Sequence, residues 1–129
     1  MKFEYAYTRI RNRYFPLVPI KLGVGDNAFE TFGLIDSGAS ISLFKTDIAH
    51  QLGIDIESGT NHILEGISGK IIVYTHEIPV FVNNVQFICR IGFSEEYIAS
   101  FNLLGRDNFF IKFLITFDEI KKKIFLESL

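Results

Sequence analysis

Short apolar runs, separated by clusters of turn-forming residues, extend along most of this 129-residue chain. Runs of this kind are typical of β-strands, and many of them in succession favour a closed β-barrel. We therefore predict an all-β barrel. Its strands are expected at Leu17 to Val24, Phe29 to Ile35, Ile63 to Leu64, Ile71 to Tyr74, Ile78 to Val82, Val85 to Phe93, Phe113 to Phe117 and Ile124 to Leu126.

Two short helices are expected to interrupt the strands. The first covers Thr46 to Leu52, with Thr46 as its N-terminal cap and Gly53 as the residue that ends it. The second covers Asp107 to Ile111, with Asp107 or Arg106 near its cap. Because the length is that of one domain and no linker interrupts the pattern, residues 1–129 are interpreted as a single domain.

Composition narrows the classes of function and the expected compartment. The net charge of -2 gives no basic field that would attract nucleic acid or an anionic membrane. Cys89 is the only cysteine, so no internal disulfide is possible and a reducing, cytoplasmic location is expected. Glu4 interrupts the first apolar residues, which argues against a signal peptide. The three histidines are scattered, so no metal is expected. Gly23-Val24-Gly25 lacks the third glycine of a dinucleotide-binding loop, so no organic cofactor is expected.

One carboxylate directly follows an apolar strand, in the segment Leu34-Ile35-Asp36-Ser37-Gly38-Ala39. Ser37 places a hydroxyl beside the acid, and Gly38 allows main chain to approach closely. The tripeptide Asp-Ser-Gly alone is weak evidence, because such a triplet occurs by chance in roughly one chain in twenty of this length. An ordinary turn after a strand would use the same three residue types.

Two later segments make the pattern specific. Gly66-Ile67-Ser68-Gly69 lies at the tip of an expected hairpin, and Leu103-Leu104-Gly105-Arg106-Asp107 precedes the second expected helix. Together with the Asp36 segment, and in this order, they resemble the retropepsin family of single-domain aspartic proteases. That family combines an apolar-apolar-Asp-Thr/Ser-Gly-Ala loop, a glycine-rich flap, and an apolar-apolar-Gly-Arg-Asp/Asn segment. The resemblance spans roughly Pro16 to Phe117.

The resemblance implies a retropepsin-like barrel that cleaves peptide bonds, with Asp36, Ser37 and Gly38 as the catalytic residues. Aspartic proteases use two carboxylates that share one proton, and one of them activates a water. This chain has a single Asp-Ser-Gly, so the pair would require a two-fold homodimer. In the family, the hydroxyl after the catalytic acid bonds to the partner's loop, and Ser37 would do so here.

The remaining family segments imply a substrate site for an extended peptide. Gly66 and Gly69 would let the flap open and close, while Ile67 and Ser68 at its tip would cover the cleft. Ala39, Leu103 and Leu104 would contribute to the peptide-binding surface beside the acid.

One position departs from the retroviral pattern. Those proteins pair the arginine that matches Arg106 with an aspartate, whereas the matching residue here is Ser40, which cannot form a salt bridge. The terminal strand Ile124 to Leu126 is a candidate for pairing across the dimer, as terminal strands do in the family.

Two alternative functions stay open at this stage. A retropepsin-like module could dimerise or bind peptides without cleaving them, although a binding module has little need for a paired acid. A β-barrel could also bind a small ligand through its interior, which contains many of the 14 phenylalanines. Such a barrel could work as a monomer.

Overall fold

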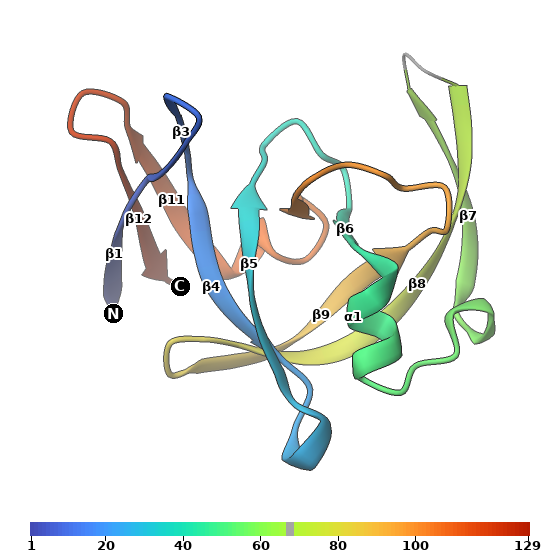
Figure 1. The fold of residues 1–129 in the computed structure, drawn as a ribbon. Coiled ribbons are helices and arrows are strands. Elements are labelled where there is room, and N and C mark those ends of the chain that lie inside the picture. Colours follow the sequence, from blue (N-terminus) through green and yellow to red (C-terminus); the bar gives the residue numbers. More distant parts are fainter. Residues whose placement is uncertain (67–68) are drawn as a thin grey trace.

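The computed structural model describes residues 1–66 and 69–129, and it consists mainly of β-strands (Figure 1). The short helices are α1 (Thr46–Gln51) and the 3-10 helices η1 (Gly25–Asn27), η2 (Ile56–Ser58) and η3 (Phe110–Lys112). No helix within these described ranges is long and apolar enough to cross a membrane. The strands are β1 (Lys2–Ala6), β2 (Thr8–Ile10), β3 (Arg13–Phe15), β4 (Leu17–Leu22), β5 (Phe29–Ile35), β6 (Ser42–Phe44), β7 (Thr60–Gly66), β8 (Gly69–Val82), β9 (Val85–Phe93), β10 (Asn102–Leu104), β11 (Phe113–Asp118) and β12 (Lys123–Ser128).

Six strands close into a barrel, which confirms the predicted all-β barrel. They follow the order β4-β5-β10-β6-β9-β8, and β8 returns to β4 to complete the ring. Two pairings in this ring are parallel, β5 with β10 and β6 with β9, whereas the others are antiparallel. Strand β7 pairs only with β8, so the β7–β8 hairpin extends beyond the ring (Figure 1).

Strands β8 and β9 form the hairpin predicted around Asn83-Asn84, and Asn83 adopts the positive φ of 52° that the tight turn requires. The sequence predicted two separate strands where the structure has one 14-residue strand, β8. His76 and Glu77, which lie between the two predicted strands, are within its ladder opposite Ile91 and Arg90. The flap region and the barrel wall are therefore parts of one continuous strand.

The barrel interior is filled by alternate side chains from its strands. Strand β9 buries Phe87, Cys89 and Ile91, while the residues between them point outward or are half-buried. Phe87, Phe109 and Phe113 form a cluster with ring centroids 5.3 to 5.9 Å apart. Burial of each such side chain contributes about 1.5–3 kcal/mol of hydrophobic stabilisation.

Helix α1 begins and ends close to the predicted residues, but its cap differs. Lys45 occupies the N-cap position, and no side chain caps the helix there, so the cap predicted at Thr46 is wrong. Gly53 follows the helix with φ of 74°, and its N–H donates to the carbonyl oxygen of His50. This confirms the predicted C-terminal glycine.

The second predicted helix is wrong over most of its length. Residues Arg106 to Phe109 form turns, and only the short η3 follows them. Asp107 does not cap η3; its carboxylate forms an ion pair with Arg90, with Nη1 and Oδ2 2.8 Å apart. A long-range partner on β9 therefore replaces the local cap that the sequence suggested.

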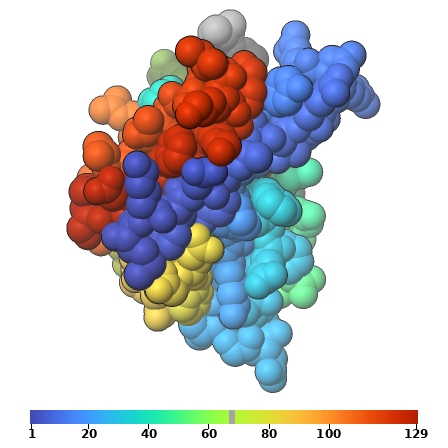
Figure 2. All heavy atoms as spheres, turned by 90° about the vertical axis from the view of Figure 1, so that its left-hand side faces the viewer, coloured from blue at the N-terminus to red at the C-terminus, as the bar shows by residue number. Residues whose placement is uncertain are grey.

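The two ends of the chain form a separate three-stranded sheet, in the order β1-β12-β11 (Figure 1). Figure 2 shows the blue N-terminal and red C-terminal residues side by side on one face of the molecule. Strand β12 is central, with β1 on one edge and β11 on the other. Both of its edges are occupied within one chain, and the pairing of Ile124 to Leu126 across a dimer stays a prediction. The hairpin β2–β3 follows β1 and turns at Arg11 and Asn12.

Candidate active site

Asp36 lies directly after β5, where that strand runs parallel to β10. The pairing aligns Leu34 with Leu103 and Ile35 with Leu104. It continues one residue further, because the N–H of Asp36 donates to the carbonyl oxygen of Leu104 across 3.1 Å. The main chain of Asp36 is thus held by the barrel while its side chain is half-buried at the barrel's rim.

A tight turn orients the Asp36 carboxylate. Oδ1 of Asp36 accepts the N–H of Gly38 at 2.9 Å, and the carbonyl oxygen of Asp36 accepts the N–H of Ala39 at 3.2 Å. A β-carbon on residue 38 would lie 3.3 Å from Oδ1, closer than most such contacts, so glycine suits this position. Ser37 is exposed at the top of the turn, where its hydroxyl is accessible to another molecule.

The segment after β10 supports this loop from beneath. The N–H of Arg106 donates to the carbonyl oxygen of Ala39 at 2.8 Å, and the N–H of Asp107 donates to that of Ser40 at 2.9 Å. The N–H of Gly105 donates to Oγ of the buried Ser42 at 3.0 Å. Three successive N–H groups therefore bind the chain that follows Asp36.

The two leucines of β10 have different environments. Leu104 is fully buried in the barrel core, whereas Leu103 is half-buried between Leu34 and Leu43. Of these two leucines, which were both predicted to contribute to the peptide-binding surface, only Leu103 has surface that a ligand could contact.

The Arg106 side chain takes no part in this support within the described part of the chain. It is exposed, and within the described part of the chain it forms no salt bridge, in keeping with Ser40 at the position of the family's aspartate. The neighbouring ion pair of Arg90 with Asp107 is the charged link between β9 and this segment, and Asp107 raises the pKa of Arg90.

The expected flap corresponds to the β7–β8 hairpin, in which Gly66 pairs with Gly69. Gly69 has φ of 118°, a conformation that residues with a β-carbon rarely adopt, whereas Gly66 does not. A β-carbon at either position would meet no atom within 4 Å. Ile67 and Ser68, predicted to cover the cleft, lie outside the described residues.

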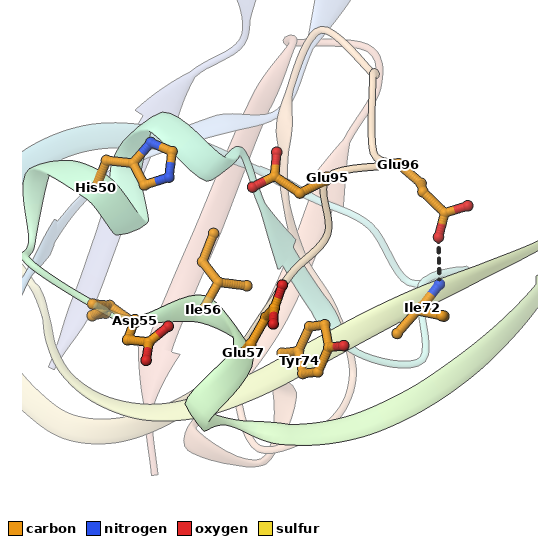
Figure 3. A pocket seen from close by; sticks show the side chains of 9 residues that line it. His50, Asp55, Ile56, Glu57, Ile72, Tyr74, Glu95 and Glu96 are labelled. Carbon is orange, nitrogen blue, oxygen red and sulfur yellow. Dashed lines mark hydrogen bonds between the residues drawn. The ribbon is translucent and has the colours of Figure 1, made fainter.

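The loop between β9 and β10 links the Asp36 region to β8. Glu96 accepts the N–H of Ile72 at 2.9 Å, which attaches the loop to the outer part of β8 (Figure 3). Its neighbour Tyr97 donates a hydrogen bond to the carbonyl oxygen of Phe101. Burial, and then the negative charge of Asp36, raise the pKa of Tyr97 to about 12, so this phenol lies within the electrostatic field of the acid.

Beside this link lies a pocket of about 390 Å³ (Figure 3). Carboxylates from two segments face it, Asp55 and Glu57 after α1 and Glu95 and Glu96 after β9. The Asp36 turn is not among its described lining residues, so the pocket is separate from the acid. No group of three or more His, Cys, Asp or Glu in the described ranges is arranged to hold a metal ion.

Sequence reasoning missed three residues that shape the site: Ser42, Tyr97 and Asn102. Asn102 is buried, and its amide accepts the N–H of Lys45 at 2.9 Å and donates to the carbonyl oxygen of Phe32 at 3.0 Å. A polar residue inside an otherwise apolar run was the available signal for Ser42 and Asn102. Tyr97 carried no comparable signal, because its relation to Asp36 exists only in three dimensions.

Comparison with known proteins gives a structural likeness only. No protein-family model matches the chain, and no curated protein matches its sequence. Among solved structures, a retropepsin-like aspartic protease from Rickettsia conorii is similar over 96% of this chain and 98% of its own, with a TM-score of 0.71 and 16% identity. EIAV protease in complex with the inhibitor HBY-793 is similar over 78% of this chain and 89% of its own, with a TM-score of 0.57 and 16% identity. The resemblance first suggested by three short segments thus extends over the whole barrel, and the chain has a retropepsin-like fold.

Proposed function

We propose that this chain is an aspartic endopeptidase that acts as a homodimer, with Asp36 as its catalytic acid. The observation that carries the proposal is the placement of Asp36 at the end of β5, with Oδ1 held by the N–H of Gly38 and its loop supported by Gly105 and Arg106. The Asp36 carboxylate is half-buried at the barrel's rim and is held in one orientation, as a catalytic acid must be. Both structural neighbours named above are proteases.

A second copy supplies the second acid in this proposal. One chain has a single Asp-Ser-Gly, and a two-fold axis beside the exposed Ser37 turn would bring Asp36 next to its twin. Two carboxylates at about 3 Å share one proton. The ionised member takes a proton from a water, which attacks the scissile carbonyl, while the protonated member donates a hydrogen bond to the carbonyl oxygen.

The substrate is an extended peptide that lies between the Asp36 loops and the β7–β8 hairpins. Ala39 and the half-buried Leu103 border the acid on the barrel side, and the hairpin that pairs Gly66 with Gly69 would cover the peptide from above. An extended peptide would bind through main-chain hydrogen bonds, and side-chain pockets would select among sequences.

The test compares wild type with Asp36→Asn in a digest of a peptide library. Asparagine keeps the shape of the turn but cannot accept the proton from water, so cleavage should fall by at least about 10³-fold. The melting temperature should stay equal or rise, because two acids no longer face each other. Wild-type cleavage should follow a bell-shaped pH profile that belongs to the pair of acids.

Two outcomes would contradict the proposal. Retained cleavage by a folded Asp36→Asn dimer would exclude Asp36 as the acid. Specific peptide binding by a wild-type dimer that cleaves no peptide of the library would favour the non-cleaving module instead.

A further inference from the structure

Figure 1 and Figure 2 show two turns from opposite ends of the sequence side by side. One joins β2 to β3 at Arg11 and Asn12, and the other joins β11 to β12. The N–H of Tyr7 donates to the carbonyl oxygen of Lys122 at 2.8 Å, and the Lys122 ammonium lies 5.7 Å from the centroid of the Tyr14 ring. Residues 8–15 and 118–123 therefore form one surface, which we call the paired turns.

The paired turns concentrate positive charge. They contain six of the 13 lysines and arginines of the chain but only two of its 15 acids. Arg11, Arg13 and Lys121 are exposed, and within the described part of the chain they form no salt bridge. The overall charge of -2, which argued against a basic field, therefore conceals a local one.

The two acids of the paired turns are engaged by their own neighbours. Asp118 accepts the N–H groups of Ile120 and Lys121 at 3.1 and 2.9 Å. Glu119 accepts the hydroxyl of Tyr7 and lies 4.0 Å from the Lys122 ammonium. Neither carboxylate forms an ion pair with the three exposed cations, so those cations are free to meet an anionic partner.

Each turn also exposes an isoleucine directly before its cations. Ile10 precedes Arg11 and is 37% exposed, and Ile120 precedes Lys121 and is 94% exposed. An aliphatic side chain flanked by cations matches the boundary of an anionic bilayer. There the aliphatic group enters the acyl region, and the cations meet the lipid phosphates.

We propose that the paired turns bind the surface of a membrane that contains anionic lipids. Ile120 and Ile10 enter the boundary between headgroups and acyl chains, while Arg11, Arg13 and Lys121 lie against the headgroups. The chain rests on the membrane and does not span it. The inference uses no residue of the candidate active site, so it stands or falls separately from the proposed function.

A membrane fits this surface better than nucleic acid does. Proteins that hold single strands stack the bases on aromatic rings. The exposed aromatic residue of the paired turns is Tyr14, and the Arg9 guanidinium at 6.0 Å and the Lys122 ammonium at 5.7 Å already lie over its ring. The phosphates of a duplex would leave Ile120 in water, whereas a bilayer removes it from water.

Co-sedimentation of the full chain with vesicles tests the charged part of the surface. The vesicles contain phosphatidylcholine with about 30% phosphatidylserine, or phosphatidylcholine alone. One variant combines Arg11→Gln, Arg13→Gln and Lys121→Gln. The matched control removes the same charge from exposed positions outside the paired turns, by Lys2→Gln, Lys21→Gln and Lys45→Gln.

Wild type should bind the vesicles that contain phosphatidylserine, and binding should weaken as salt screens the charges. Each cation near an anionic surface contributes roughly fivefold to affinity, so the variant of the paired turns should bind about 100-fold more weakly. The control variant should lose less than about fivefold, because its charges lie away from the membrane. Equal melting temperatures check that both variants are folded.

A second pair of variants tests insertion. Ile120→Ser should weaken vesicle binding by about tenfold, because serine gains little from leaving water. Ile98→Ser is the matched control, since Ile98 is 93% exposed on the loop between β9 and β10, and Ile120 is 94% exposed. The Ile98 variant should bind as wild type does.

Four results would overturn the inference. The first is a wild type that does not bind the vesicles containing phosphatidylserine, and the second is an equal loss in the two charge variants. The third is full binding by Ile120→Ser, which would point to an acidic protein as the partner. The fourth is tighter binding to a DNA duplex than to the vesicles at equal phosphate and salt concentration, which would point to nucleic acid.

Discussion

A β-carbon on Gly105 would lie 2.3 Å from the carbonyl oxygen of Ile41, in the strand-to-loop segment that follows Asp36. The same carbon would be 2.8 Å from the carbonyl oxygen of Ala39. Both neighbours are main-chain atoms, which cannot move aside as a flexible side chain can. The glycine after Leu104 therefore sets how closely the supporting segment approaches the loop that carries the acid.

Gly105→Ala should consequently destabilise the protein by about 2–4 kcal/mol, because the added methyl overpacks a buried contact. Urea unfolding measures this loss. Any peptidase activity should fall more than the fraction of folded protein explains, because the displaced loop carries Asp36. Arg106→Ala, which shortens the exposed side chain of the next residue, is the control and should change the free energy of unfolding by less than about 0.5 kcal/mol. A Gly105→Ala protein as stable as wild type would show that the loop can move away.

Gly69 and Gly66 provide a matched pair for testing the flap. Only Gly69 has positive φ, so Gly69→Val should strain the hairpin by about 1–3 kcal/mol, whereas Gly66→Val meets open space and ordinary main-chain geometry. If the hairpin closes over a peptide, kcat/KM should fall clearly for Gly69→Val and little for Gly66→Val. Equal effects of the two substitutions would remove the special role of the Gly69 conformation.

Asn102 connects β10 to the start of α1, since its amide bonds both Lys45 and Phe32. Asn102→Ala should lower the free energy of unfolding by about 2–4 kcal/mol, because it leaves two main-chain groups without their partner. The exposed Asn61→Ala on β7 is the control and should be nearly neutral. A small effect at Asn102 would mean that water replaces its amide.

The buried thiol of Cys89 should make the free energy of unfolding depend on pH, and the direction follows from its pKa. Burial raises the pKa of its thiol from 9.0 to about 12. The unfolded thiol therefore loses its proton near pH 9, while the folded thiol keeps it until about pH 12, so the unfolded state binds fewer protons in this window. The free energy of unfolding should fall as pH rises from 9 to 12, by at most about 1.4 kcal/mol per pH unit from this group.

Cys89→Ala should remove that part of the slope. The cavity lowers stability by the same amount at every pH, and the tyrosines with raised pKa contribute to both proteins alike. Chemical denaturation at several pH values between 8 and 11 therefore isolates the thiol. Identical slopes for the two proteins would show that the thiol ionises in the folded state.

Much of the barrel was predictable because the residues within and beside its longer strands are enough to identify them. Phe29 to Ile35 and Val85 to Phe93 match β5 and β9 in both bounds, since apolar residues and flanking turns define them. The strands β6 and β10 were missed because each has three residues and exists only through partners far along the chain. The first three strands were missed as well, and β1 is defined by its pairing with β12 at the opposite end of the sequence.

The candidate site likewise contains residues that the sequence could identify and residues that only the tertiary structure brings into place. Asp36 and Leu103 to Arg106 were recognisable because contiguous residues form each segment, and the structure brings those segments together through β5 and β10. The local cap assigned to Asp107 failed because Arg90, a distant residue, competes more strongly for its carboxylate. Tyr97 depends entirely on how its loop folds back toward Asp36, which no local pattern encodes.

The long strand β8 has a consequence for how the barrel opens. Ring closure between β4 and β8 uses two residue pairs, Lys21 with Phe81 and Leu22 with Val80, and the hydrogen bond from the N–H of Gly23 to the carbonyl oxygen of Pro79. This seam lies near the end of the same strand whose beginning forms the hairpin with β7. Hydrogen exchange by local unfolding should be faster at this short seam than in the longer ladder of β8 with β9. Since one stiff strand joins the seam to the hairpin, tension applied at the tip would reach the seam without passing through a loop, and fraying at the seam would loosen the hairpin in turn.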